Sequence, residues 1–462
     1  MREGSLEAPV RHPVDWQNPD FHDEGLLDAE MRRIFDVCHG CRRCFNLCDS
    51  FPRLFNLVDH APSEELDTVE SKDFAKVVDA CTLCDMCFLT KCPYVPPHPF
   101  NLDFPHLMLR YRAARARKGG VAFAVDQMTR TDRNGRVAGK VAALANWATS
   151  TGNRVTRRVM ETVAGIDAAA SLPKFHGRTF VMRARDDPPA LNPAGPALGR
   201  RAVFYATCFV NYNNPGIGQA AQSVLAHNGV ETAVAYPGCC GMPQLEQGRI
   251  EAVVERAGRV ARHLGAWVDK GYDVVALVPS CALMLKFEWL HLVPAGHPDR
   301  AAVERLSRAT FDIAEYIVDI ARKEGLAPGL RPLPGGVTLH IACHARAQNM
   351  GQKAAEMLRL IPGDAAQDAE SGKMAPAELK VVERCSGHGG SWGIMKGNFE
   401  TALKVGKPVA AQAVRNAKHF VASECPLSGE HIRQGMERLD PAWTASVEQL
   451  HPVEIFARAY GL

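Results

Sequence analysis

The chain has 462 residues, of which 46% are hydrophobic and 23% are charged, and its 54 Lys and Arg against 51 Asp and Glu give a formal net charge of +3. This composition is typical of a globular protein of about three domains, and it excludes disordered and collagen-like chains. Because the net charge is small and no long run carries one sign, we expect no nucleic-acid partner.

The cellular compartment decides whether the cysteines form disulfides or stay reduced. Residues 1–20 carry charges and prolines where a secretory signal has an apolar core, and no window approaches 18 consecutive apolar residues. We therefore expect a cytoplasmic protein. Its 15 cysteines would be kept reduced there, so clustered cysteines favour metal ligation over disulfides.

Eight cysteines form two tight runs near the N-terminus, Cys38-x2-Cys41-x2-Cys44-x3-Cys48 and Cys81-x2-Cys84-x2-Cys87-x4-Cys92-Pro93. Three thiolates spaced by two residues fit one corner of a 4Fe–4S cluster, and in two-cluster ferredoxins the fourth Cys of each run ligates the other cluster. This crossed rule assigns one cluster to Cys38, Cys41, Cys44 and Cys92, and the second to Cys81, Cys84, Cys87 and Cys48. The competing assignment is zinc, whose sites pair two C-x2-C knuckles and do not need a third evenly spaced Cys.

The spacer between the runs, residues 49–80, is longer than that of a small ferredoxin and contains a helical-looking stretch at residues 72–78. The arrangement resembles the iron–sulfur subunits of respiratory dehydrogenases, in which a ferredoxin-like core is embedded in helices. Two closed, all-Cys clusters leave no iron open to a substrate. The expected role of this part is electron relay.

The segment 104–160 is strongly basic, with 12 Arg and Lys against Asp126 and Asp132. Apolar residues alternate with Arg110, Arg112, Arg115 and Arg117, which predicts short basic amphipathic helices. Such helices bind anionic membrane surfaces. The alternatives are a solvated basic face packed on the ferredoxin core or a docking surface for an acidic partner.

Two stretches rich in Pro and Gly, residues 187–199 and 325–336, delimit two units that read as an internal repeat. In the first unit we expect strands at 202–206, 232–235 and 273–278 and helices near 218–227 and 250–270. In the second unit we expect strands at 337–342, 379–382 and 419–422 and helices at 352–360 and 399–415. Each unit is thus a βαβαβ fold with a parallel sheet.

A cysteine follows each of these strands: Cys208, Cys239-Cys240 and Cys281 in the first unit, and Cys343, Cys385 and Cys425 in the second. The carboxyl ends of parallel strands meet at one edge of the sheet, where open α/β sheets bind ligands. These seven cysteines should therefore converge on two crevices, or on one crevice between the units. We expect them to bind one or two further iron–sulfur clusters.

The motifs GCCGMP at 238–243, SCALMLK at 280–286, CHARAQ at 343–348 and CSGHGGSWG at 385–393 resemble the Cys-Cys-Gly domains of heterodisulfide reductase B-type subunits. A dicluster ferredoxin followed by two such domains is similar to the C subunit of anaerobic glycerol-3-phosphate dehydrogenase and to related glycolate and lactate oxidase subunits. The resemblance implies a multidomain chain of α+β and α/β classes. Its parts are a helical dicluster ferredoxin-like domain (1–103), a basic amphipathic helical connector (104–186) and two Cys-Cys-Gly repeats with parallel sheets (200–325 and 336–462).

The chain also departs from the full Cys-Cys-Gly pattern. Met284 replaces the last Cys of the first repeat, which leaves four thiolates, enough for one ordinary cluster. Ser386 and Ser428 replace two cysteines of the second repeat, which leaves three. Three thiolates would leave one iron of a cluster without a cysteine ligand. That iron could be an open catalytic corner or could take His344 or His388 as a ligand. The remaining alternative is that the second repeat holds no cluster.

These observations leave two main functional hypotheses. The first is an iron–sulfur electron-transfer subunit, which the resemblance places between a flavin dehydrogenase or other redox partner and an acceptor such as the quinone pool, peripheral on the inner face of the cell membrane. The alternative is a stand-alone, heterodisulfide reductase-like enzyme with an open metal site in the second repeat. The sequence carries no Walker motif or Ser-His-Asp signature, so flavin and nicotinamide are expected on a partner. A structural metal scaffold is a third reading.

Overall fold

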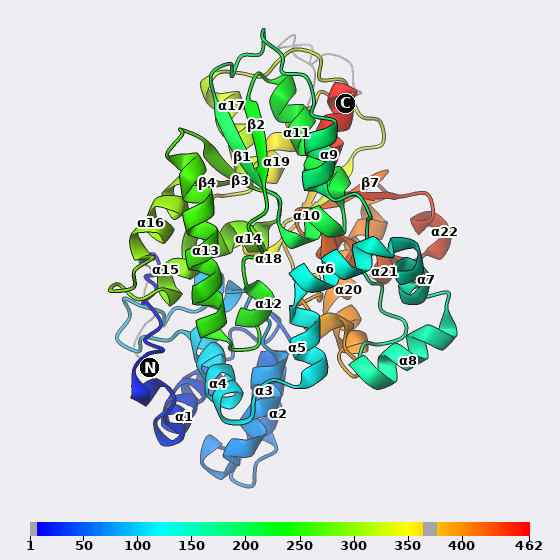
Figure 1. The fold of residues 1–462 in the computed structure, drawn as a ribbon. Coiled ribbons are helices and arrows are strands. Elements are labelled where there is room, and N and C mark those ends of the chain that lie inside the picture. Colours follow the sequence, from blue (N-terminus) through cyan, green and yellow to red (C-terminus); the bar gives the residue numbers. More distant parts are fainter. Residues whose placement is uncertain (1–6, 364–376) are drawn as a thin grey trace.

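The structure is a computed structural model that describes residues 7–363 and 377–462. Figure 1 shows the blue N-terminal helices below a first parallel sheet and the orange and red C-terminal elements beside it. The expected domains 1–103 and 336–462 each include residues outside the described parts. Below, the N-terminal lobe is residues 7–119, the first sheet lobe is residues 200–325, and the second sheet lobe is residues 336–363 with 377–462.

The N-terminal lobe is built from helices around one apolar core. Its helices are α1 (Glu24–Cys41), α2 (Ser50–Asp59), α3 (Phe74–Ala80) and α4 (Phe104–Gly119), with short turns η1 (Pro19–Phe21), η2 (Leu66–Thr68), η3 (Ser71–Asp73) and η4 (Cys87–Lys91). The Asp23 side chain accepts a hydrogen bond from the Leu26 amide and starts α1. The buried apolar residues of α1 share one helical face: Leu27, Met31, Ile34 and Phe35.

The helix α4 belongs to this lobe, although its sequence is basic. Its Leu107, Met108 and Leu109 are buried. Arg112 is also buried; it donates hydrogen bonds to the carbonyls of Val78, Cys81 and Glu246. The expectation that Arg112 lies on a solvated basic face is therefore wrong, because this side chain ties α3 and the following Cys81 turn to the first sheet lobe.

Between the N-terminal lobe and the first sheet run five helices: α5 (Phe123–Thr129), α6 (Thr131–Lys140), α7 (Ala142–Thr149), α8 (Arg154–Ala164) and α9 (Phe180–Asp186). We call α5 to α8 the connector helices. They expose an unusual number of large apolar side chains: Phe123, Val137, Val141, Leu144, Trp147, Val155, Val159 and Val163. Among the described residues, none of the helices has the length and apolar content needed to cross a membrane.

The two sheet lobes have the same strand order, and all their strands are parallel. The first sheet runs β2 (Glu231–Ala235), β1 (Arg201–Tyr205), β3 (Asp273–Ala276) and β4 (Thr310–Asp312). The second runs β6 (Leu379–Val382), β5 (Val337–His340), β7 (Phe420–Ser423) and β8 (Glu448–Leu450). Each sheet thus has a fourth strand that the sequence did not predict, because TFD and EQL lack an apolar run.

Helices connect the parallel strands in both sheet lobes. The first sheet lobe contains α10 (Cys208–Tyr212), α11 (Pro215–His227), α12 (Met242–Leu245), α13 (Ile250–Val268), α14 (Pro279–Leu283), η5 (Met284–Glu288), α15 (Trp289–Leu292), α16 (Arg300–Ala309) and α17 (Ile313–Lys323). The second contains α18 (Cys343–Arg346), α19 (Lys353–Leu358), η6 (Trp392–Ile394), α20 (Phe399–Asn416), α21 (Pro426–Leu439), α22 (Pro441–Thr444) and α23 (Pro452–Tyr460). The C-terminal α23 packs against α11, and α17 packs against α19, so one core continues through both lobes.

Candidate iron–sulfur sites

The first group of cysteines lies between α1 and the turn that follows η4. Cys38, Cys41, Cys44 and Cys92 line one cavity, which also has Phe51, Phe55 and Tyr94 in its wall. Burial, followed by the neighbouring Cys92, Cys44 and Cys41, raises the pKa of Cys38 well above its ordinary value. Arg42, between two of these cysteines, has a positive φ of 49°, which turns the chain back over the cavity.

The second group contains Cys81, Cys84, Cys87 and Cys48. Burial and then the Cys84 and Cys81 thiols raise the pKa of Cys48. Leu83 and Asp85, on either side of Cys84, have positive φ angles of 47° and 62°. This tight winding points successive cysteines to one place. The structure thus gathers the eight cysteines into the two groups that the crossed rule predicts, with Cys48 and Cys92 exchanged between the runs.

The third group lies where β1, β2 and β3 of the first sheet end, and it contains Cys208, Cys239, Cys240 and Cys281. The Sγ atoms of Cys240 and Cys281 are 3.4 Å apart. Hydrogen bonds from the Cys208 and Cys240 thiols lower the pKa of Cys239. Gly238 and Gly241 flank the Cys-Cys pair with φ angles of 140° and 93°, which L side chains rarely adopt.

The fourth group, Cys343, Cys385 and Cys425, lies at the corresponding edge of the second sheet. Burial and then the Cys84, Cys385 and Cys425 thiols raise the pKa of Cys343. Cys385 is solvent-exposed, and its Sγ accepts a hydrogen bond from the Gly387 amide. Ser428, which stands where the full motif has a Cys, forms a side-chain hydrogen bond with Cys425.

His344 and His388, which the sequence suggested as ligands for the fourth group, have different surroundings in the structure. Both ring nitrogens of His344 are engaged, with Nδ1 2.8 Å from Ser280 Oγ and Nε2 3.3 Å from the Leu83 carbonyl. The His388 ring instead faces His431, at 5.8 Å between ring centroids. His344 therefore joins the three cysteine loops, and His388 opens on a different cavity.

The groups adjoin one another in an order that sequence reasoning did not find. Cys84 and Cys343 both pack against one small apolar cluster of Met86, Leu283 and Ala347, so the second group neighbours the fourth. Cys281 contributes to raising the pKa of Cys425, which places the third group beside the fourth. The second, fourth and third groups are therefore neighbours in that order, from the N-terminal lobe through the second sheet lobe to the first.

A buried ionic cluster lies next to the second group of cysteines, since Asp85 directly follows Cys84. Arg11 contacts Asp85 at 2.7 Å, Asp103 at 2.9 Å and Glu288 at 3.4 Å, and its guanidinium lies over the Phe88 ring. Burial raises the pKa of Glu288 to about 8. For Asp103, burial is outweighed by His106 and Arg11, which lower its pKa to about 2. No sequence motif predicted this cluster, because its members are far apart in the chain.

The thiols suit clusters better than single ions. In residues 7–363 and 377–462, no three Cys, His, Asp or Glu side chains are arranged to hold one metal ion. A 4Fe–4S cluster spreads its four thiolates around a larger body, since each bonds a different iron. Four soft sulfur donors around one cavity, as at Cys38, Cys41, Cys44 and Cys92, fit such a cluster.

Comparison with known proteins agrees with this reading of the cysteines. Residues 37–95 match the model of the 4Fe-4S dicluster domain, and residues 202–286 match the model of the Cysteine-rich domain. The C subunit of the anaerobic glycerol-3-phosphate dehydrogenase of Escherichia coli (strain K12) is 25% identical over 338 residues, which cover 72% of this chain and 76% of the relative. The chain is homologous to this dehydrogenase component.

Two further relatives extend the homology. The B subunit of a fumarate reductase (CoM/CoB) from Methanothermobacter marburgensis is 26% identical over 273 residues, which cover 58% of this chain and 48% of the relative. Lactate utilization protein A from Geobacillus kaustophilus is 25% identical over 228 residues, covering 49% of this chain and 87% of the relative. The homologues of this chain therefore include components of a dehydrogenase and of a reductase, which is consistent with an electron-transfer role.

Proposed function

We propose that the chain is an iron–sulfur electron-transfer subunit of an oxidoreductase. The observation that carries the proposal is the succession of neighbouring cysteine groups, in which Cys84 and Cys343 pack against one apolar cluster and α14, which contains Cys281, packs against α18, which begins at Cys343. In the proposal, Cys38, Cys41, Cys44 and Cys92 hold one 4Fe–4S cluster, and Cys81, Cys84, Cys87 and Cys48 hold the second. Bound clusters supply one-electron carriers, and the protein sets their order and excludes water from them.

The proposal extends to the seven remaining cysteines. The third group has four thiols and would hold a complete cluster, whereas the fourth has three and Ser428 in place of another. The equal strand order of the two sheets, β2-β1-β3-β4 and β6-β5-β7-β8, supports an ancient duplication of one Cys-Cys-Gly unit. On this view the units span residues 200–325 and 336–462, and the second has lost thiols.

We also propose that the connector helices dock on the inner face of the cell membrane. In α8 the exposed Val155, Val159 and Val163 recur every four residues and form one stripe, beside the basic residues Arg154 and Arg158. Apolar insertion together with attraction to anionic lipids is how interfacial helices bind. The docking would bring a partner, such as a flavin dehydrogenase, and a quinone to the same surface.

A cavity of about 430 Å³ gives such an acceptor access to the second cysteine group. Its wall contains Cys81, apolar Val125 and Met128 of α5, and Trp392. Burial raises the pKa of Glu246, also in this wall, to about 7, so its carboxyl can carry a proton near neutral pH. The wall also contains the polar side chains of Arg115, Gln247 and Asn398. A site that combines apolar side chains with hydrogen-bonding groups can hold a quinone head group and bond its two oxygens.

Quinone binding can be tested through Trp392 itself. A short-chain quinone should quench the tryptophan fluorescence of the intact chain in a saturable way, and Trp392→Phe should remove the saturable part. Trp267→Phe, which alters a tryptophan in α13 remote from this cavity, is the control. Equal quenching of both variants would contradict the quinone assignment and leave the electron-transfer role to other acceptors.

Membrane docking has its own test. Vesicles containing anionic lipid should pellet the chain at low salt, and Val159→Asp should weaken this because a charge enters the apolar stripe. Recovery with vesicles should also fall as salt screens the basic residues. The control Leu439→Asp changes an exposed apolar side chain of α21 and should recover like the parent. Equal recovery of both variants would contradict docking through α8.

One observation favours a second candidate, a reductase with an open metal site in the second sheet lobe. Cys385 is the one exposed cysteine of the fourth group. Because Ser386 and Ser428 stand in place of cysteines, this group has only three thiol ligands. An open position would exchange added ligands such as cyanide, and electron paramagnetic resonance would show one signal shifting while the others stay. Loss of that signal in Cys385→Ala, with no loss in Cys240→Ala, would support the reductase; no shift in any signal would exclude it.

A further inference from the structure

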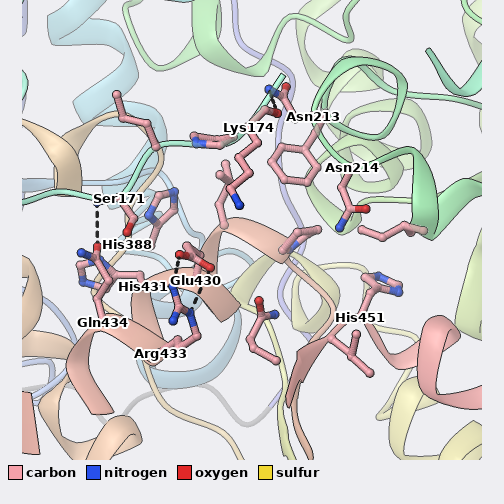
Figure 2. A pocket seen from close by; sticks show the side chains of 18 of the residues that line it. Ser171, Lys174, Asn213, Asn214, His388, Glu430, His431, Arg433, Gln434 and His451 are labelled. Atoms are coloured by element: carbon pink, nitrogen blue, oxygen red, sulfur yellow. Dashed lines mark hydrogen bonds and ion pairs between the residues drawn. The ribbon is translucent and has the colours of Figure 1, made fainter. Parts of the chain in front are cut away.

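A cavity of about 360 Å³ lies between the two sheet lobes, apart from the four cysteine groups. Its wall is formed by residues 171–176, the start of α11, the start of α21 and the loop before α23 (Figure 2). Phe209 and Pro426, the residues directly after Cys208 and Cys425, also line it. Neither the electron-transfer proposal nor the sequence motifs account for this cavity.

Two buried imidazoles in the cavity wall each leave one ring nitrogen without a hydrogen-bond partner. His388 and His431 are only 8% and 4% exposed, and the Nε2 atom of each is buried without a partner. Burial lowers the pKa of both rings, for His388 to about 3, so both are neutral. His431 hydrogen-bonds to the backbone of Ala402; since Nε2 is unpartnered, that bond uses Nδ1, and Nε2 is left as a bare acceptor.

A buried acceptor without a partner is destabilising, so each such atom calls for an explanation, and a bound group that donates a hydrogen bond supplies one. A metal ion does not fit here, because within the described residues no three potential ligands are arranged to hold one. The occupant must instead bring a proton donor, such as a hydroxyl group.

The remaining charges of the cavity favour an anion. Lys174 lines the cavity and extends into it (Figure 2). The helix α11 begins at the cavity without a side-chain hydrogen bond at its N-cap, so its positive dipole end faces the cavity. Two carboxylates oppose this charge: Glu430 is neutralised by Arg433 at 2.9 Å, and burial raises the pKa of Glu454.

We propose that this cavity binds a small organic anion that carries a hydroxyl group, such as a 2-hydroxycarboxylate. The hydroxyl donates to His431 Nε2 beside His388, and the anionic group lies toward Lys174 and the start of α11. The volume accommodates an anion of a few carbon atoms together with water. This site is independent of cluster binding, so it stands or falls separately from the proposed electron-transfer role.

The hydroxyl requirement can be measured without any activity assay. Lactate and propionate differ only by the hydroxyl group, and isothermal titration calorimetry on the intact, iron-loaded chain should show lactate binding about three- to tenfold more tightly, as expected for one hydrogen bond. A parallel titration with 2-hydroxyethyl phosphate shows whether carboxylate or phosphate is the preferred anionic group. Equal affinity for lactate and propionate, or binding of neither, would overturn the proposal.

Variants then locate the site. His431→Leu should abolish the preference for lactate over propionate, whereas Lys174→Gln should weaken both ligands about two- to fivefold and keep the preference. His60→Leu, an exposed histidine of the N-terminal lobe, is the control. If His431→Leu melts early, His388→Leu serves in its place. A preference unchanged in both histidine variants would place the hydroxyl elsewhere and refute the site.

Discussion

Replacing Arg11 with Met removes a cation that contacts three buried carboxylates from two lobes. Arg11 holds Asp85 and Asp103 of the N-terminal lobe and Glu288 of the first sheet lobe, and its own side chain is only 10% exposed. Removing one partner of a buried ion pair costs about 3 to 5 kcal/mol, because the remaining charges stay buried without compensation. The lowering of the Asp103 pKa from 3.8 to about 2 alone corresponds to about 2 kcal/mol of folding free energy. His106 supplies a part of this stabilisation and Arg11 another part.

The pH dependence of this loss has a definite sign. In the parent, the lowered pKa of Asp103 contributes stability that is present above its ordinary pKa and lost as the pH falls toward about 2. In Arg11→Met the buried carboxylates gain raised pKa values, and Glu288 rises above its present value of about 8. Their ionisation then costs more as the pH rises. The stability difference between parent and variant should therefore be smallest near about pH 5 and grow as the pH rises, with a further increase above about pH 8, where Glu288 ionises in the parent before it does in the variant.

Anaerobic urea unfolding followed by circular dichroism measures both effects. Arg185→Met breaks an exposed contact with Asp186 and should change the free energy of unfolding by less than about 1 kcal/mol. A loss in Arg11→Met no larger than in this control, or a loss that does not vary with pH, would refute the role given to the buried cluster.

Three further outcomes follow from the same structure. Arg112→Gln should lower the free energy of unfolding by about 3 kcal/mol in urea titrations, because three backbone carbonyls lose a charged donor, whereas the exposed Arg117→Gln should not. Cys92→Ser should disturb the cluster of the first group only, and Cys48→Ser that of the second only, which electron paramagnetic resonance distinguishes; disturbance of both signals by each variant would contradict the crossed arrangement. Gly387→Ala should destabilise the second sheet lobe in thermal melts, since a Cβ would lie 1.9 Å from the Ala402 carbonyl oxygen.

The sequence predicted most of what is local. Apolar runs bounded by Gly and Pro placed six strands to within about two residues, and the C-x2-C spacing grouped the N-terminal cysteines because three such thiols need only a tight turn. The pairing of Cys48 and Cys92 across the runs came from a rule about ferredoxins. Strands β4 and β8 were not predicted, because three-residue strands with polar residues carry no periodic signal.

What the sequence did not reveal depends on contacts between distant segments. Arg112 reads as part of a basic face, yet it is buried, since α4 turns it toward the carbonyls that end α3 and α12. The apolar cluster against which Cys84 and Cys343 both pack joins residues about 260 positions apart and has no local pattern. His388 and His344 each follow a Cys closely and look alike as candidate ligands; only the fold shows that one is fully hydrogen-bonded and the other faces a cavity.

Iron content per chain tests the central claim most directly. Protein prepared anaerobically should contain about eight irons from the two N-terminal groups alone, more where the sheet lobes are loaded, and its visible absorption should bleach on reduction. Cys38→Ser and Cys81→Ser should each lower the iron by about four per chain. About four irons in the parent, or zinc in place of iron with no visible absorption, would contradict the electron-transfer account.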